Sequence, residues 1–221
     1  MKDKLVFKTY PAPEVNIREI KRYMRSPENS DITDELIKEC LYEAKESIKY
    51  TVCFCEFKVE KCGDVLDLGF CKTSSKDIAK NLKNADTAVL FAATVGIGID
   101  RLVAKYGRIS PLKSLCFDAV GSERIESLCD AFNGEIKLYA KENKKTAFPR
   151  FSPGYGDFSI EVQKDILYTL DAQKKLGITL SDSLMMTPSK SVTGLIGLGN
   201  GECGCAAGCE LCSKTDCEFR R

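Results

Sequence analysis

Residues 150–199 have the sequence RFSPGYGDFSIEVQKDILYTLDAQKKLGITLSDSLMMTPSKSVTGLIGLG, which predicts a loop, a helix, a short strand and a second loop. The opening RFSPGYG combines one arginine, one proline and two glycines. Glycine lets the backbone approach a ligand closely, and proline holds its neighbour extended. The planar donor fork of arginine suits a carboxylate. This composition indicates a ligand-binding loop, although these features alone also fit an ordinary surface turn.

The helix of this stretch is expected to begin at Asp157 or Ser159, because both side chains are good N-caps, and to end at Gly177. One apolar face is formed by Val162, Ile166, Leu170 and Leu176. A short apolar strand, 184–186, follows. The small-residue segment SKSVTG, 189–194, is predicted as the second loop, so two polar loops containing glycine flank one helix and one strand.

Two motifs in this stretch resemble the activation domain of cobalamin-dependent methionine synthase. Arg150, three residues and Gly154–Tyr155 match the first motif of that family, and Pro188-x-x-Ser-Val-Thr-Gly matches its Pro-x-x-Ser-Val-Ser-Gly loop. The run AVGSERIESLCDAF, 119–132, is similar to the helix that precedes the first motif. The resemblance implies an α+β fold with a mostly antiparallel, bent sheet and flanking helices.

The resemblance also implies a function. The chain is expected to be a reductive activator that binds S-adenosylmethionine and positions its methyl group for re-methylation of Co(II)/Co(I) cobalamin. The cobalamin is expected on a partner, either a methionine synthase that lacks its own activation domain or another corrinoid protein. A low-potential donor such as flavodoxin or ferredoxin is expected to supply the electron. The protein's share of this chemistry is positioning, so no catalytic acid, base or nucleophile is assigned.

The residues that the resemblance assigns to the ligand lie in both motifs. Arg150 is expected to bind the ligand's carboxylate. The ligand slot is expected to be shaped by Ser152, Pro153, Gly154 and Tyr155, and its opposite wall by Ser191, Thr193 and Gly194. The family places an acidic residue shortly before its arginine, for which Glu142 is the nearest candidate. Arg25 stands where the family has a ligand-contacting aspartate, so that contact is in doubt.

Composition excludes several other classes of function. The 221 residues include 33 basic and 32 acidic side chains, so bulk charge favours neither nucleic acid nor a membrane surface. No apolar run reaches the length of a membrane span, and the charged start MKDKLVFK does not resemble a signal peptide, so a cytoplasmic protein is expected. With no histidine, the chain has no Cys–His nucleophile, Ser–His–Asp triad or Asp-x-His-x-x-Gly cobalamin loop.

The last residues differ from the rest. We expect one globular domain over 1–199 and a Cys-rich tail over 200–221. Candidate metal ligands in the tail are Cys203, Cys205, Cys209, Cys212 and Cys217. Four thiolates suit a [4Fe–4S] cluster or zinc, and the cluster is favoured because only one CxxC pair is present. Disulfides or an unliganded tail remain open.

The tail supports an alternative function, an iron–sulfur electron-transfer or redox-sensing protein whose main body binds a partner. A third possibility is an S-adenosylmethionine-binding protein that acts on another acceptor. The electron-carrier interpretation needs only the tail, whereas the activator interpretation needs Arg150 and the second motif.

Upstream, the pattern of apolar residues predicts further elements. Helices are expected over 14–25, from Asp31 or Thr33 to 48, from Ser74 or Ser75 to 83, and over 111–132, the last followed by a polar loop. A hairpin is expected from strands 50–60 and 65–70 around the turn 62–64. A buried strand, a glycine turn and a helix are expected between residues 86 and 107.

Overall fold

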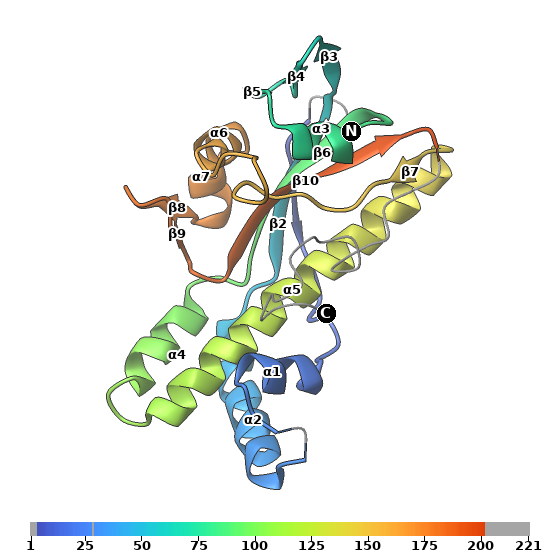
Figure 1. Cartoon of the computed structure of the whole chain (residues 1–221). Helices are drawn as coiled ribbons and strands as arrows, with labels where there is room; N and C mark the ends of the chain where they lie inside the picture. Colours follow the sequence, from blue (N-terminus) through green and yellow to red (C-terminus); the bar gives the residue numbers. More distant parts are fainter. Residues whose placement is uncertain (1–3, 28, 202–221) are drawn as a thin grey trace.

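The computed structural model describes residues 4–27 and 29–201, and its centre is a five-stranded antiparallel sheet (Figure 1). The strand order is β1 (Val6–Thr9), β2 (Thr51–Lys58), β6 (Ala85–Thr94), β10 (Ser191–Gly199) and β7 (Thr146–Ala147). Every neighbouring pair is antiparallel. The predicted α+β fold with a mostly antiparallel, curved sheet is confirmed.

Each face of the sheet packs against its own set of helices. Val89 and Phe91 of β6 belong to a cluster with α1 (Ile17–Tyr23), α2 (Asp31–Ala44), α4 (Gly98–Tyr106) and α5 (Pro111–Glu142). Leu90 and Ala92 belong to a second cluster with α3 (Lys76–Asn81), α6 (Val162–Thr169) and α7 (Ala172–Leu176). Because side chains alternate along a strand, successive residues of β6 and β10 belong to opposite layers.

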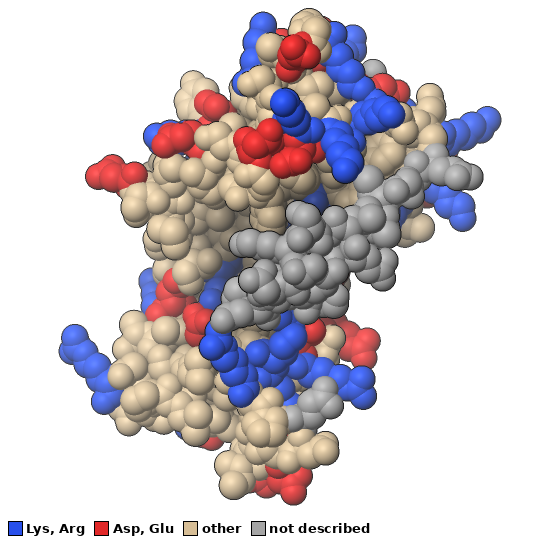
Figure 2. Space-filling view, in the orientation of Figure 1, with Lys and Arg blue, Asp and Glu red and all other residues tan. Residues whose placement is uncertain are grey.

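Smaller elements complete the described chain. A 3-10 turn, η1 (Lys45–Ser47), follows α2. The predicted turn at 62–64 is confirmed, but it joins the short strands β3 (Glu60–Cys62) and β4 (Val65–Asp67), with β5 (Lys72–Thr73) beside β4. The pairing predicted for strand 50–60 is wrong, because most of that strand is β2, which pairs with β1 and β6. A two-stranded ribbon consists of β8 (Thr179–Leu180) and β9 (Met186–Thr187). No helix among the described residues is both long and apolar enough to cross a membrane. Figure 2 shows basic and acidic side chains distributed over the visible face, in keeping with the net charge of +1.

Helix α5 is longer than the sequence predicted. It begins at Pro111, with Ser110 as its N-cap, and its 32 residues continue through Asn133 and Gly134 to Glu142. The predicted end near residue 132 and the polar loop after it are therefore wrong. Ile136 and Ala140 extend the buried stripe of the helix, each 1% exposed, and this packing outweighs the helix-breaking tendency of Asn-Gly.

The helix predicted from 157 or 159 to 177 is two shorter helices, α6 and α7. Asp171 has a φ of 47°, and this left-handed residue ends one helix and precedes the next. Gly177 ends α7 with a φ of 70°, as predicted. Asp157 caps no residue of α6. Its carboxylate instead accepts hydrogen bonds from the backbone N–H groups of Lys76 and Asp77, at the start of α3.

The segment predicted as the second loop is the beginning of a strand. Ser191 to Gly199 form β10, which pairs along its length with β6, so the prediction of a loop over SKSVTG is wrong for residues 191–194. Small residues suit this part of β10. Gly194, for example, lies opposite Phe91, where there is little room for a side chain. Such a composition is also typical of loops, and this explains the error.

Candidate functional site

The two sequence motifs lie side by side in the structure. Phe151 exchanges backbone hydrogen bonds with Leu195 of β10, at 2.9 Å and 2.8 Å, and Phe148 N–H donates to the carbonyl of Gly197 at 2.8 Å. A Cβ atom added to Gly194 would lie 3.0 Å from Ser152 Oγ and 3.1 Å from the carbonyl oxygen of Phe151. The close approach of the two motifs therefore requires glycine at this position.

The turn after Arg150 is held by local hydrogen bonds and by α3. Gly154 has a φ of 88°, and its N–H donates to the carbonyl of Phe158 at 2.8 Å. Pro153 is buried, whereas the Tyr155 side chain is 67% exposed and its ring lies edge-on to Phe151 at 6.4 Å. The turn thus presents an accessible aromatic ring on a fixed backbone.

Asp157 joins this turn to the N-terminus of α3. Its carboxylate accepts a hydrogen bond from the Ser75 hydroxyl in addition to the two backbone N–H groups of α3. In return, the Asp77 carboxylate accepts from the Asp157 N–H at 3.1 Å. The hydrogen bond from Ser75, followed by those from the backbone, lowers the pKa of Asp157, so the carboxylate stays ionised and keeps these bonds at neutral pH.

The hydroxyl groups of the second motif lie on the other layer. Ser191 and Thr193 pair with Thr94 and Ala92 of β6 and are 8% and 2% exposed. Ser191 Oγ donates to the carbonyl of Pro188 at 2.7 Å and lies 2.9 Å from Thr94 Oγ1. Of the three residues predicted for the opposite wall, only Gly194 lies on the α5 layer.

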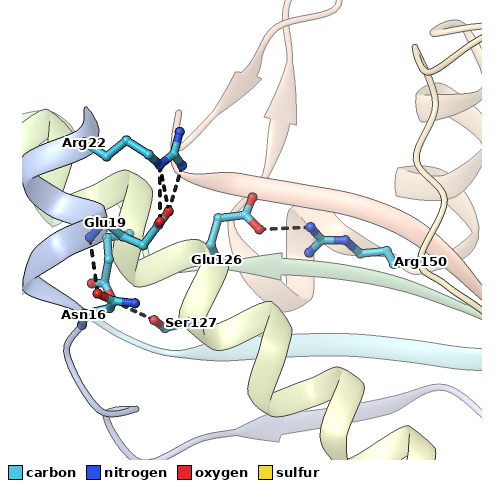
Figure 3. Close-up of polar contacts among 7 residues, drawn as sticks. Asn16, Glu19, Arg22, Glu126, Ser127 and Arg150 are labelled. Atoms are coloured by element: carbon cyan, nitrogen blue, oxygen red, sulfur yellow. Dashed lines mark hydrogen bonds and ion pairs between the residues drawn. The ribbon is translucent and has the colours of Figure 1, made fainter. Parts of the chain in front are cut away.

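Arg150 lies against α5. Its Nη2 forms an ion pair of 2.9 Å with Glu126 Oε2 (Figure 3). Its Nη1 is buried and has no hydrogen-bond partner among the described residues. Burial alone would lower the pKa of Arg150, but the neighbouring Cys129 and Glu126 raise it above its ordinary value. The guanidinium is therefore charged, and one of its nitrogens retains unused donor capacity in a buried place.

Sequence analysis missed the acidic partner of this arginine. Glu142, the candidate for the family's acidic residue before the arginine, is the last residue of α5, whereas Glu126 pairs with Arg150. The polar loop predicted over 137–149, which is wrong for residues 137–142, directed attention to the nearest acid in the sequence. A continuous α5 would have placed all its acidic side chains among the candidates.

A cavity of about 140 Å³ lies between α1 and α5 beside this ion pair. Its lining residues are Asn16, Glu19, Tyr23, Glu123, Glu126, Ser127 and Asp130. None of the eight predicted ligand-binding residues lines it, and Glu126 connects it to Arg150 (Figure 3). The sequence contained no periodic or motif signal for this cavity, because its residues come from two helices about 100 positions apart.

The charges around the cavity are nearly balanced. Four of its lining residues are acidic, and three of these are paired with arginines. The pairs are Glu19 with Arg22 at 2.7 Å, Glu123 with Arg124 at 2.5 Å, and Glu126 with Arg150 at 2.9 Å. Carboxylate oxygens accept hydrogen bonds from an ammonium group, and the spare nitrogen of Arg150 can donate to a carboxylate. The arrangement therefore suits a zwitterion such as an α-amino acid.

The size of the cavity limits what it can hold. Sites for whole drug-sized ligands are typically about 300–1,000 Å³. A cavity of about 140 Å³ is large enough only for a small molecule or for one end of a larger one.

Two further predictions have different outcomes. The candidate ligands Cys203, Cys205, Cys209, Cys212 and Cys217 lie outside the described residues, so the metal site remains a prediction. Within residues 4–27 and 29–201, no cluster of three or more Cys, Asp or Glu side chains is arranged to hold a metal ion. Arg25 follows α1 with a φ of 53°, outside the lining of the cavity.

Comparisons with known proteins agree with this architecture. Residues 69–201 match the family described as "Vitamin B12 dependent methionine synthase, activation domain", and this range includes both motifs and all of α5. No curated protein sequence matches the chain. A similar solved structure is titled "Crystal Structure of the MetH Reactivation Domain bound to AdoHcy"; it has 14% sequence identity and a TM-score of 0.63. The similarity covers 89% of this chain and 78% of that chain, and it shows a shared fold. Because the family match extends over more than half of the sequence, the chain belongs to the family of vitamin B12-dependent methionine synthase activation domains.

Proposed function

We propose that this protein binds S-adenosylmethionine at Arg150 and the adjoining cavity, and positions its methyl group for re-methylation of cobalamin on a partner protein. Membership of the activation-domain family supports a role in methionine synthase reactivation. The similar MetH domain was crystallised with AdoHcy, which shares its α-amino-acid end with S-adenosylmethionine.

One observation carries the proposal. The Nη1 atom of Arg150 is buried without a hydrogen-bond partner among the described residues, while Nη2 is paired with Glu126 on the wall of the cavity. A buried donor without an acceptor is unfavourable, and a ligand carboxylate would supply the missing acceptor. The ligand's ammonium group would then lie near the cavity carboxylates. The residues present therefore fit the amino-acid end of S-adenosylmethionine.

The rest of the ligand is assigned to the turn and to β10. The exposed ring of Tyr155 offers an apolar surface for the adenosyl group, and Gly194 lets the turn that carries this ring lie directly against β10. When bound, S-adenosylmethionine supplies the methyl group, and the residues of this chain bind and orient it. Ser191 and Thr193 act through the backbone of β10, because their side chains are buried on the other layer.

The partner and the electron source complete the proposal. Cobalamin is held by a methionine synthase or another corrinoid protein, since this chain contains no histidine for a cobalamin loop. The electron comes from a low-potential protein such as flavodoxin or ferredoxin, or from a cluster held by the Cys-rich tail.

Anaerobic calorimetric titration of S-adenosylmethionine into the purified protein tests the site. We expect saturable binding that Arg150→Ala weakens by roughly ten- to hundredfold, because a charge-assisted hydrogen bond contributes about 1.5–3 kcal/mol. Arg108→Ala is the matched control, since Arg108 is exposed and lies outside the cavity lining.

Two results would contradict the proposal. One is the absence of binding both to the protein alone and in the presence of a cobalamin-loaded methionine synthase. The other is equal affinity for the parent and the folded Arg150→Ala variant. The first result would make electron transfer through the Cys-rich tail the leading interpretation, and the second would place the ligand site away from Arg150.

A further inference from the structure

We propose that Arg124 is a positioning residue that holds the α1 wall of the cavity against the α5 wall and so sets the affinity for the ligand. This inference rests on the proposed function. Arg124 lies on α5, is 2% exposed and does not line the cavity. It would act on the ligand only through the residues that it holds.

The guanidinium of Arg124 connects α5 to the segment that leads into α1. Its Nη1 donates to the carbonyl of Pro13 at 2.7 Å, and its Nη2 donates to the carbonyl of Glu14 at 2.8 Å. Residues 13 and 14 lie only two or three positions before Asn16, which is both the N-cap of α1 and a lining residue of the cavity. One side chain of α5 therefore fixes the point at which α1 begins.

Glu123 strengthens this connection. Both of its oxygens are bound by Arg124 at 2.5 Å, and Oε1 also accepts from the Asn16 N–H at 3.0 Å. Ser127, another lining residue, donates to the same oxygen at 2.7 Å (Figure 3). Glu123 is itself a wall of the cavity, so the network joins lining residues of both helices through one buried ion pair.

A role in positioning explains why a charged pair is present at this buried place. Both side chains are 2% exposed, and replacing such a pair by apolar residues of similar volume is often neutral or stabilising. An apolar pair could not bind two backbone carbonyls and one backbone N–H in fixed directions. The planar fork of arginine can, because its donors have a rigid geometry.

A second, partly buried ion pair provides a control on the same helix. Lys21 of α1 pairs with Asp34 of α2 at 2.7 Å, and its side chain is 8% exposed. This pair holds α1 to α2 and does not involve the cavity lining. Asp34→Asn therefore weakens the attachment of α1 without releasing the segment that Arg124 holds.

The test compares Arg124→Lys with Asp34→Asn. Lysine keeps the charge but lacks the fork that spans both carbonyls. Two quantities are measured for each variant: the affinity for S-adenosylmethionine by calorimetry, and the hydrogen-exchange rate of the Asn16 amide. Both are measured under conditions in which the two variants are folded to the same extent. We expect Arg124→Lys to weaken binding by roughly tenfold and to speed exchange at Asn16. Asp34→Asn should change neither, even where its melting temperature falls equally.

Equal losses of affinity in the two variants would overturn the inference, and so would an unchanged exchange rate at Asn16 in Arg124→Lys. Should that variant not fold, Glu123→Gln replaces it, and the exchange rate at Asn16 decides. Absence of binding by the parent protein would contradict the proposed function instead. The exchange measurement would still show whether Arg124 holds α1.

Discussion

Replacing Gly194 by alanine tests whether the two motifs must touch. The new methyl group would lie 3.0 Å from Ser152 Oγ, 3.1 Å from the Phe151 carbonyl oxygen and 3.1 Å from Phe91 Cε1. Phe91 is completely buried, and the Phe151 carbonyl is bonded to Leu195, so neither can move freely. Overpacking of this kind typically costs about 1–3 kcal/mol. We expect Gly194→Ala to lower the free energy of unfolding by about 2 kcal/mol.

Gly194→Ala should also lower the affinity for S-adenosylmethionine. Relief of the contact requires the segment 150–152 to move away from β10, and Arg150 would move with it. Urea unfolding and calorimetric titration with S-adenosylmethionine measure the two effects. Gly134→Ala is the control, because nothing lies within 4 Å of a Cβ atom at that exposed position of α5. It should stabilise the protein by about 0.5–1 kcal/mol and leave affinity unchanged.

One result would refute this reasoning. A Gly194→Ala protein with the stability and affinity of the parent would show that the segments do not lie as closely as described. A loss of stability without a loss of affinity would show that the position of Arg150 does not depend on β10.

Three further predictions concern α3, the core and the tail. The hydrogen bond from the Ser75 hydroxyl lowers the pKa of Asp157 in the folded protein. The ionised Asp157 therefore stabilises the fold at pH values above its unfolded pKa of about 3.9, and this stabilisation is lost as the pH falls through its folded pKa. Urea unfolding should therefore show Asp157→Asn to be less stable than the parent near neutral pH, with a difference that shrinks as the pH falls below about 4; equal stability at neutral pH would contradict the contact. Phe132→Ala should lower the unfolding free energy by about 3–5 kcal/mol, because this fully buried ring packs against two other aromatic rings; a loss below about 1 kcal/mol in urea would argue against that packing. Anaerobically purified protein should contain iron and sulfide that Cys209→Ser with Cys212→Ser removes, and an equal metal content in both proteins would contradict a tail-bound cluster.

The sequence predicted the elements with strong local signals. The N-terminal helices, the turn around Gly63 and the end of α7 at Gly177 were found because caps, turn residues and apolar periodicity agree there. The family resemblance assigned the two motifs to one site, and the structure places them side by side; that they bind a ligand stays a prediction.

The errors arose where tertiary packing outweighs local preference. Asn133 and Gly134 favour the end of a helix, yet α5 continues because Ile136 and Ala140 are buried against the rest of the protein. SKSVTG has the composition of a loop, yet most of it is a buried strand whose small residues fit against Phe91 and the Arg150 segment. Neither neighbour can be inferred from the segment itself.

The cavity could not be predicted for a different reason. Glu126 and its neighbours lie on α5. The sequence of a helix predicts which of its faces is apolar, but not which other segment its polar residues face. That they face Asn16 and Glu19 depends on the path of the segment just before α1, in which the carbonyls of residues 13 and 14 accept hydrogen bonds from Arg124. Backbone acceptors have no sequence signature, so this contact was invisible before the structure.

The attachment of Arg150 to β10 has a consequence for how the family can change. The strand that supports the arginine lies inside the sheet, between β6 and β7, so it belongs to the part of the chain on which folding depends. Most substitutions there are expected to lower the stability of the fold, whatever their effect on a ligand. With the ligand at the proposed cavity, ligand preference is therefore expected to change mainly through the lining side chains of the α1 segment. A mutant library intended to alter ligand choice should vary Asn16, Glu19 and Tyr23 and leave β10 intact.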